Sequence, residues 1–199
     1  MKLIHIQGPS PLFTNTFLVI TAAGHAIAID PAAAAARYTD ALAAEHATLT
    51  DIFLTHGHYD HVGAVNALKK ATGAKVYLDP ADCRGDTLYP LRQADAGYQD
   101  GGELKVDELV FKTWHTPGHT KGSWCFYCDG YLFSGDTLFA GSCGRVDMPG
   151  GSAQDMMASL SKLAALPLPD ETRVLPGHEG FSTLGEEKKH NPYMRGEFF

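Results

Sequence analysis

Residues 54–63, LTHGHYDHVG, hold three histidines and one aspartate within six positions. His56 and His58 are two residues apart, and alternate side chains of an extended chain point to the same side, so both imidazoles can enter one pocket. Imidazole and carboxylate groups are ligands that zinc, iron and manganese take in proteins. The segment therefore predicts a metal site, with Asp60 and His61 at the start of the following helix, where a carboxylate is electrostatically favoured.

Three further segments place a histidine or an aspartate after a β-rich run and beside small residues. HTPGHTKGS contains His119, LFSGDTLF contains Asp136 and VLPGHEG contains His178. Glycine lets the backbone approach a site closely, and α/β folds build sites at the carboxyl ends of strands. Seven candidate ligands are too many for one catalytic zinc ion, which takes three protein ligands and keeps one position open. They suit two ions that share a bridging carboxylate.

The other histidines lack this context. We expect ordinary polar roles for them, with a supporting role near the site considered only for His115, which precedes His119 by four residues: His5, His25, His46, His115 and His190.

These side chains need strands to carry them to one edge of a sheet. TFLVIT and HAIAID, joined by Ala-Ala-Gly, predict a β-hairpin. AAAAARYTDALAAEH predicts a helix with Tyr38 and Leu42 on one face. DIFLT and KVYLD predict strands on either side of a helix in VGAVNALKKATG that ends at Gly73. Residues 80–103 are expected to be an irregular crossing segment, and residues 84–100 to help line the substrate pocket.

The second half continues the same alternation. LVFKTWH, SWCFYC, YLFSG and RVLP predict strands, and AQDMMASLSKLAAL predicts an amphipathic helix with Met156, Leu160 and Leu163 on one stripe. LGEEKKHNPYMRGEFF predicts a short helix and an ordered end. Together these elements indicate an α/β domain without an internal linker.

Composition excludes several classes of function. A net charge of −7 without a basic stripe argues against nucleic-acid binding. No apolar run approaches the roughly 18 residues of a membrane span, and MKLIHIQGPSP lacks the features of a signal peptide, so we expect a cytoplasmic protein that does not bind membranes. Cys125 and Cys128 are three apart on a predicted strand, so they face opposite sides and suit neither a redox motif nor a zinc knuckle.

The motif THGHYDH, followed by His119, Asp136 and His178, resembles the metallo-β-lactamase superfamily over nearly the whole chain. GDTLFAGSCGR and PGHEG…NPYMR are most similar to the glyoxalase II (hydroxyacylglutathione hydrolase) group, in particular its short bacterial relatives. The resemblance implies one domain over residues 1–199, with a four-layer αβ/βα sandwich and two metal ions at one edge.

The resemblance also implies a role for each site residue. His56, His58 and His119 would hold the first metal ion; Asp60, His61 and His178 would hold the second; Asp136 would bridge the two; Asp30 would support the loop beneath the site; and Arg145 stands where glyoxalase II has a basic residue that touches the carboxylate of the thiol cofactor.

Three positions depart from the glyoxalase II pattern. The chain ends at Phe199, without the C-terminal helical domain that grips glutathione, and Gly180 replaces the tyrosine after GHE that contacts glutathione. Ala32 replaces the usual glycine after DP. The first two departures affect glutathione recognition and leave the catalytic core intact.

The expected activity is hydrolysis of a thioester of a small thiol, of the S-D-lactoylglutathione type. Two divalent ions, most simply zinc with iron or manganese as alternatives, would supply a hydroxide at neutral pH. Asp60 and Asp136 would be the catalytic carboxylates, and Tyr59 and Arg145 would contact the substrate. No Ser or Cys nucleophile is required, although Cys143 lies in the loop on the substrate side.

Other activities stay open at this point. Persulfide dioxygenases resemble the same group and use one iron held by two histidines and one aspartate, here His56, His119 and Asp136. A β-lactamase and a metal-dependent binding or regulatory protein are further alternatives. The acyl group, the thiol and the oligomeric state stay undetermined.

Overall fold

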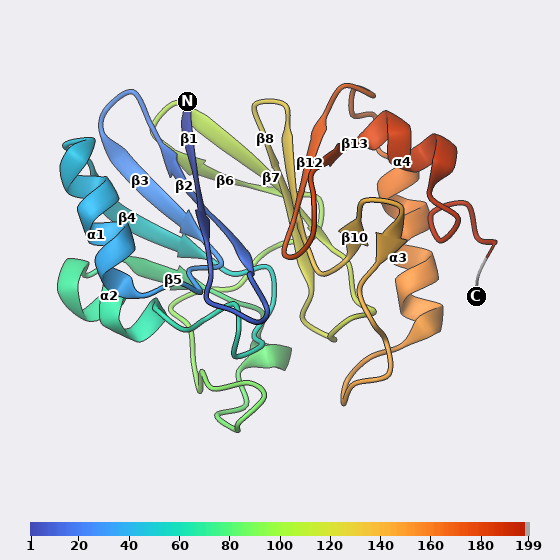
Figure 1. The fold of residues 1–199 in the computed structure, drawn as a ribbon, viewed down its shortest axis with the longest axis horizontal. Helices are drawn as coiled ribbons and strands as arrows, with labels where there is room; N and C mark the ends of the chain where they lie inside the picture. Colours follow the sequence, from blue (N-terminus) through green and yellow to red (C-terminus); the bar gives the residue numbers. More distant parts are fainter. Residues whose placement is uncertain (198–199) are drawn as a thin grey trace.

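Two stacked β-sheets, each covered by helices on its outer face, form four layers in the computed structural model, which describes residues 1–197 (Figure 1). The first sheet has the strand order β1 (Lys2–Gln7), β2 (Asn15–Ile20), β3 (His25–Ile29), β4 (Thr48–Phe53) and β5 (Lys75–Tyr77). The second has the order β13 (Ser182–Thr183), β12 (Arg173–Pro176), β9 (Tyr131–Gly135), β8 (Trp124–Cys128), β7 (Leu109–His115) and β6 (Gly102–Val106).

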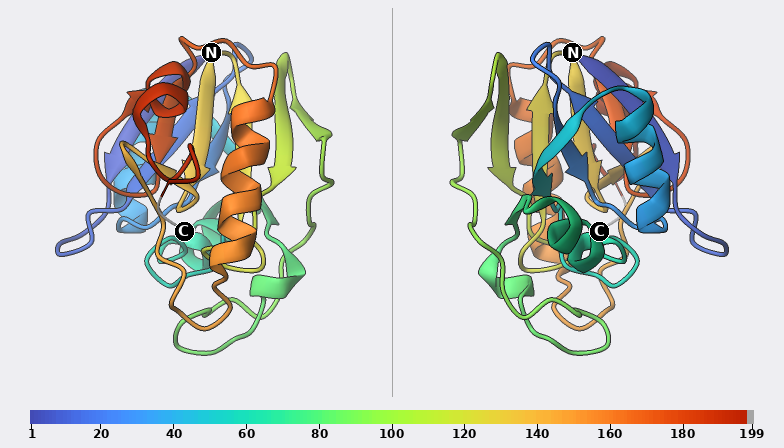
Figure 2. Two further views of the ribbon diagram at one scale, coloured as in Figure 1. Left: turned by 90° about the vertical axis from the view of Figure 1, so that its right-hand side faces the viewer. Right: turned by 90° about the vertical axis from the view of Figure 1, so that its left-hand side faces the viewer.

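Helices and two short elements complete the fold. Helices α1 (Ala35–Ala44) and α2 (Val65–Thr72) cover the first sheet, and α3 (Ala153–Ala165) and α4 (Leu184–His190) cover the second, with α3 running across its outer face (Figure 2). A 3₁₀ turn, η1 (Pro80–Asp82), follows β5, and β10 (Leu138–Phe139) pairs with β11 (Ser142–Cys143). The predicted four-layer sandwich is thus confirmed.

Aromatic side chains fill the layer between the two sheets. Phe53 of β4 makes an edge contact with Phe111 of β7, at a centroid distance of 5.2 Å, and a tilted contact with Phe126 of β8, at 5.9 Å. Phe17 of β2 meets Phe133 of β9 at 5.4 Å. Because these rings come from both sheets, their burial fixes how the strand ends of one sheet face those of the other.

The outer apolar layers agree with the predicted helix faces. Tyr38 and Leu42 of α1 are buried against the first sheet, as predicted. Met156, Leu160 and Leu163 of α3 are buried against the second sheet, again as predicted. The predicted β-hairpin is the antiparallel pair β2–β3, and the strands β4, β5, β7, β8, β9 and β12 fall on the predicted runs.

The cysteine pair also lies as expected. Cys125 belongs to the apolar layer beneath α3, and Cys128 belongs to the layer between the sheets. The two thiols therefore face opposite sides of β8, and neither is in a disulfide.

Among the strands of residues 1–197, five lie outside the predicted runs, namely β1, β6 and the two-residue strands β10, β11 and β13. β1 and β6 are the outermost strands of their sheets on one side, and most of their side chains are exposed or half-buried. An edge strand with a weak apolar pattern gives little periodic signal. β6 also begins at Gly102, inside the segment expected to be irregular, which otherwise contains only η1 and loops.

The predicted start of the second helix is wrong. Helix α2 begins at Val65, and Asp60 and His61 lie in turns that precede it. The N–H of His61 donates to the carbonyl of His58, and the N–H of Ala64 donates to the carbonyl of Pro31. The first bond closes a turn within the segment and the second ties it to the end of β3, so both side chains can turn toward the neighbouring strand ends.

Two further predictions concern the ends of the chain and the membrane. The predicted C-terminal helix is α4, while residues 198–199 lie outside the described part. Among residues 1–197, no helix is long and apolar enough to cross a membrane.

Replacing Leu160 by alanine should destabilise the fold. Its side chain is fully buried beneath α3, so Leu160→Ala removes apolar contacts and leaves a cavity, at a cost of about 2–5 kcal/mol. Met157 of the same helix is 39% exposed, so Met157→Ala should change the free energy of unfolding by less than about 0.5 kcal/mol. Urea unfolding of both variants measures the difference, and equal effects would contradict the packing described here.

Candidate metal centre

All seven predicted side chains meet where strand ends of both sheets come together. The loop after β4 carries His56, the loop after β7 carries His119, Asp136 directly follows β9, and His178 follows β12 by two residues. Within each of three overlapping groups, one ligand atom per residue lies within 4.8 Å of the others: His56, His58 and His119; His56, His61 and Asp136; and Asp60, His61 and His178.

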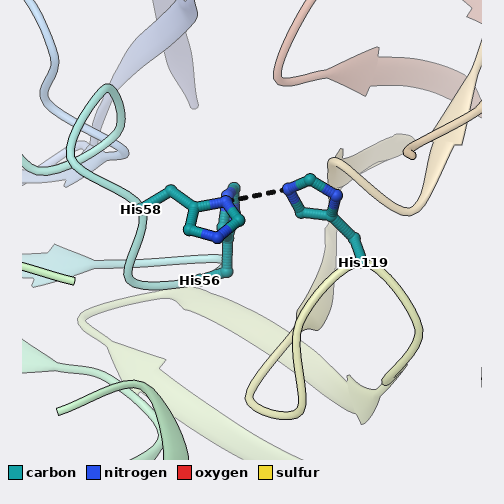
Figure 3. Close-up of side chains that lie close together, drawn as sticks. All are labelled: His56, His58 and His119. Carbon is teal, nitrogen blue, oxygen red and sulfur yellow. Dashed lines mark hydrogen bonds between the residues drawn. The ribbon is translucent and has the colours of Figure 1, made fainter. Parts of the chain in front are cut away.

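The first group consists of three buried imidazoles. His56 and His58 enter from one loop and His119 from another, and their rings point toward one another (Figure 3). The Nδ1 atom of His58 lies 2.9 Å from the Nε2 atom of His119. The buried Nε2 atom of His56 has no hydrogen-bond partner.

The second group joins Asp60, His61 and His178. The Nε2 atoms of His61 and His178 are 3.3 Å apart. An oxygen of Asp60 lies 3.2 Å from Nε2 of His178 and 3.8 Å from Nε2 of His61.

Asp136 lies between the two groups. Its Oδ2 atom is 3.4 Å from Nε2 of His119 in the first group and 3.6 Å from Nε2 of His178 in the second. Its Oδ1 atom is 3.4 Å from Nε2 of His61 but forms no hydrogen bond. The carboxylate can therefore reach a cation in either group.

Outward hydrogen bonds assign the imidazole tautomers. Nδ1 of His119 lies 2.8 Å from the carbonyl oxygen of Arg145, and Nδ1 of His178 lies 3.0 Å from that of Leu12. A carbonyl only accepts, so each Nδ1 carries a proton and each neutral ring turns an Nε2 lone pair toward the cluster. Such outward partners orient metal-binding histidines generally.

Asp30 orients two more rings. Its carboxylate accepts hydrogen bonds from the N–H of Thr55, at 2.7 Å, and from the hydroxyl of Thr55, at 2.6 Å, and it lies 3.0 Å from Nδ1 of His61. Because the Thr55 hydroxyl gives its proton to Asp30, its oxygen accepts from Nδ1 of His56, 3.1 Å away. Both rings again present Nε2 inward, and Asp30 lies beneath the site.

Two glycines are required by this crowding. Gly135 has a φ of +49°, and a Cβ there would lie 2.3 Å from the hydroxyl oxygen of Thr55. A Cβ on Gly177 would lie 2.3 Å from Oδ1 of Asp136. The small residues before Asp136 and His178 are therefore the ones that let these loops close around the cluster.

Burial and charge set the protonation of the first group and of the central carboxylate. Burial and, to a lesser extent, the neighbouring imidazoles lower the pKa of His56 well below its ordinary value and that of His58 to about 4. Burial opposes ionisation of Asp136, but the nearby His61, His119 and His56 outweigh it and hold its carboxyl pKa well below the usual range. The two imidazoles are thus neutral and the carboxylate is ionised, as metal ligands must be.

The second group is more basic. Burial opposes protonation of His61, yet the carboxylates of Asp136 and Asp30 raise its pKa well above the ordinary value. For His178, the hydrogen bond to Asp60 and the charge of Asp136 outweigh burial and raise the pKa. The same hydrogen bond, against burial, lowers the pKa of Asp60.

These atoms fit a pair of cations. Nε2 of His119 turns its lone pair into the first group, where it lies 2.9 Å from Nδ1 of His58. His56 Nε2 and Asp136 Oδ1 are buried acceptors without a donor, which is costly unless a ligand satisfies them. Nitrogen and carboxylate oxygen atoms together suit zinc, iron or manganese.

A cavity of about 410 Å³ opens onto the cluster, with Leu88, Phe139 and Met148 among its apolar walls. Leu88 comes from the segment expected to line the pocket. Tyr59, which is 50% exposed, and Arg145 are at its rim. The guanidinium of Arg145 forms two hydrogen bonds to the carboxylate of Asp147, at 2.7 and 2.9 Å, while its carbonyl oxygen holds His119.

Four of the other histidines bind elsewhere. His5 pairs with Asn15, His25 with Asp107, and His190 with Glu186, while Nε2 of His115 contacts the carbonyl oxygen of Lys121.

Several supporting residues were not predicted. The side-chain amide of Asn15 donates to the carbonyl oxygens of Pro176 and Glu179 and so holds the loop that carries His178. Thr55 links Asp30 to His56, and the buried Asp82 accepts hydrogen bonds beside both loops of the first group. Thr55 adjoins the histidine motif, but single polar residues distant in sequence leave no comparable signal.

Known proteins share this architecture. The metallo-beta-lactamase superfamily matches residues 9–178. An uncharacterized protein from Aquifex aeolicus is 34% identical over 206 residues, which cover 96% of this chain and 96% of that protein. A hydroxyacylglutathione hydrolase from Pseudomonas aeruginosa is 46% identical over 134 residues, which cover 66% of this chain but 48% of that enzyme.

Solved structures are similar over almost the whole chain. ETHE1 from Myxococcus xanthus has a TM-score of 0.85 at 33% identity, covering 98% of this chain and 85% of that one. The BLEG-1 B3 metallo-beta-lactamase has a TM-score of 0.85 at 32% identity, covering 97% of this chain and 99% of that one. TTHA1623 in a di-iron-bound form has a TM-score of 0.81 at 34% identity, covering 96% of this chain and 99% of that one. The chain therefore belongs to the metallo-β-lactamase superfamily, whose members are mostly metal-dependent enzymes with a dinuclear His/Asp metal centre.

Proposed function

We propose that this protein is a dinuclear metallohydrolase that cleaves the thioester of a small thiol, of the S-D-lactoylglutathione type. The observation that carries the proposal is the second group: Asp60, His61 and His178 lie together beside the three-histidine group, with Asp136 in reach of both. Two ligand sets joined by one carboxylate suit a pair of ions better than a single ion.

The chemistry would be divided between the ions and the chain. Two divalent ions held here would bring the pKa of a bound water to about 7 and offer positive charge to a carbonyl oxygen. Asp60 lines the cavity beside His178, where its carboxylate can orient a water molecule and take a proton. Leu88, Phe139 and Met148 limit the access of bulk water.

A thioester has an acyl arm and a thiol arm, and the cleft has room for both. Beyond Leu12 and Tyr59, which line the first cavity, lies a second hollow of about 400 Å³ that shares these two residues and Asp60. The guanidinium of Arg145 also lines the first cavity, where a carboxylate of the thiol arm would take the place of Asp147 as its partner.

No side-chain nucleophile is required. Cys143 lines the cavity, but burial raises the pKa of its thiol to about 11, so the thiol stays protonated at neutral pH. The similarity to a hydroxyacylglutathione hydrolase favours a thioester substrate. This chain spans about half of that enzyme, so glutathione as the thiol is part of the proposal.

One alternative has its own support. ETHE1 from Myxococcus xanthus is similar along 98% of this chain, which favours a mono-iron persulfide dioxygenase as the second candidate. That activity would use His56, His119 and Asp136 and would leave His178 outside the set of ligands.

His178 therefore distinguishes the two activities. With zinc, iron or manganese added, hydrolysis of S-D-lactoylglutathione is followed by loss of thioester absorbance, and dioxygenase activity by oxygen uptake with glutathione persulfide. We expect hydrolysis, and we expect His178→Ala to lower kcat/KM by about 100-fold or more because a ligand of the second ion is lost.

His190→Ala is the matched control, since this histidine is exposed and pairs only with Glu186. It should keep full activity. Two results together would favour the dioxygenase over the hydrolase. The unmodified protein would not hydrolyse the thioester, and His178→Ala would still take up oxygen with glutathione persulfide.

Asp136→Ala should release the metal ions from both groups of ligands. The central carboxylate is within 3.6 Å of imidazoles in each, so its removal takes a ligand and a negative charge from both ions. Metal content measured after dialysis should fall from about two ions per chain to well below one, as expected for a bridging ligand. Asp40→Ala, on the exposed face of α1, should keep both ions. Full metal content in Asp136→Ala would refute the bridging role.

Binding of the second ion should depend more strongly on pH. His61 and His178 have raised pKa values and must lose protons to bind a cation, whereas His56 and His58 are already neutral. Below these raised pKa values, each proton that must be released weakens cation binding about tenfold for every unit by which the pH falls. Zn²⁺ titrations between pH 6 and 8 should show two steps that separate as the pH falls. Steps that shift in parallel would contradict this assignment.

A further inference from the structure

A buried carboxylate lies outside the seven side chains but between the loops that carry three of them. Asp82, the last residue of η1, is 1% exposed. Its Oδ2 atom accepts hydrogen bonds from the N–H of Gly57, at 2.9 Å, and from the hydroxyl of Thr120, at 2.8 Å. Its Oδ1 atom accepts from the N–H of Gly122, at 3.1 Å.

These donors adjoin the first group directly. Gly57 separates His56 from His58, and Thr120 follows His119. One carboxylate thus joins the loop after β4, from the first sheet, to the loop after β7, from the second. The N–H of Trp124 donates to the carbonyl oxygen of Thr55 and joins the same segments at the strand ends, but Asp82 joins them beside the ligands.

The carboxylate of Asp82 is the acceptor that the donors of both loops share. Within residues 1–197, Asp82 has no ion-pair partner, and its hydrogen bonds come from neutral groups. Burial raises its pKa, which is the sign of a carboxylate whose desolvation is only partly repaid. An apolar side chain here would leave the N–H groups of Gly57 and Gly122 without their acceptor.

The loops pack tightly against this side chain. A Cβ on Gly57 would lie 2.8 Å from Cβ of Asp82, and one on Gly122 would lie 2.7 Å from its Cγ. Both backbones therefore approach Asp82 as closely as glycine allows, and the carboxylate acts as a spacer of fixed length.

Asp82 is itself held in place. The side chain of Asp79 accepts hydrogen bonds from the N–H of Ala81 and from Nε1 of Trp124, which fixes the turn. Because Thr120 gives its hydroxyl proton to Asp82, the oxygen of Thr120 accepts from the hydroxyl of Ser123, 2.8 Å away. The spacer belongs to a network in which every donor has a partner.

We propose that Asp82 is a positioning residue that sets the separation of the His56–His58 loop and the His119 loop, and thereby the metal affinity of the first group. The inference rests on the proposed metal centre. It predicts a larger effect on the first group, because the hydrogen bonds of Asp82 adjoin ligands on both loops of that group and none reaches the loops of Asp136 or His178.

The test measures each group alone. His178→Ala weakens the second group and reports on the first, and His58→Ala does the reverse. Zn²⁺ dissociation constants are measured in both backgrounds by competition with a chromophoric chelator, with and without Asp82→Ala. In the His178→Ala background, loss of Asp82 should raise the dissociation constant about 10- to 100-fold and change the visible spectrum of bound Co²⁺. In the His58→Ala background, Asp82→Ala should change the Zn²⁺ dissociation constant by no more than about twofold.

Two variants guard against a general loss of folding. Asp82→Asn keeps the shape of the side chain and one acceptor oxygen, so it should raise the Zn²⁺ dissociation constant of the first group by less than Asp82→Ala does. Asp79→Ala weakens the same turn but leaves the hydrogen bonds from both loops to Asp82, so it should lower Tm without moving the first-group constant beyond about twofold.

The outcomes separate the two proposals. An equal loss in both backgrounds, no loss in either, or the same loss from Asp79→Ala would overturn the role of Asp82. If neither background binds Zn²⁺ while Asp82 is intact, the proposed metal centre itself fails and takes this inference with it.

Discussion

The structure depends on one constraint: five imidazole rings converge on a largely buried space, where nitrogens of neighbouring rings lie about 3 Å apart. Nδ1 of His58 faces Nε2 of His119 at 2.9 Å, and the Nε2 atoms of His61 and His178 face each other at 3.3 Å. Four of the five rings are satisfied on the outside, by Leu12, Thr55, Arg145 and Asp30, but not on the inside. The buried Nε2 of His56 and Oδ1 of Asp136 have no hydrogen-bond donor, so the space between the rings favours a cation that would satisfy them.

The same contacts join the two halves of the fold. Asp30, after β3, fixes rings that follow β4, while Asn15 of β2 donates to the loop after β12 in the other sheet. The aromatic layer between the sheets brings these strand ends together, and the polar contacts at the edge then fix their separation. Packing and ligand geometry are therefore coupled, so a shift of one sheet against the other would separate the ligands.

Much of this could be predicted from the sequence because its signals are local. The histidine motif is dense, and long apolar runs mark the buried strands. Asp60 was placed in a helix because an acid there fits the rule for helix starts, but the hydrogen bond from Ala64 to Pro31 prevails over that preference. Asp82 in DPADC resembles an ordinary turn residue, and Leu12 and Arg145 act on histidines through carbonyl oxygens, which every residue has. Roles of this kind are visible only in three dimensions.

The division between the cluster and its rim bears on specificity. The ligands are held by buried carboxylates and backbone carbonyls, whereas Tyr59, Leu12 and the side chain of Arg145 project into the cleft and are exposed. Arg145 combines both parts, since its carbonyl holds His119 while its guanidinium pairs with Asp147. A different side chain there would alter what the rim binds and leave the hydrogen bond to His119 in place. This separation explains how a hydroxyacylglutathione hydrolase, a B3 metallo-beta-lactamase and ETHE1 can all be similar to one chain.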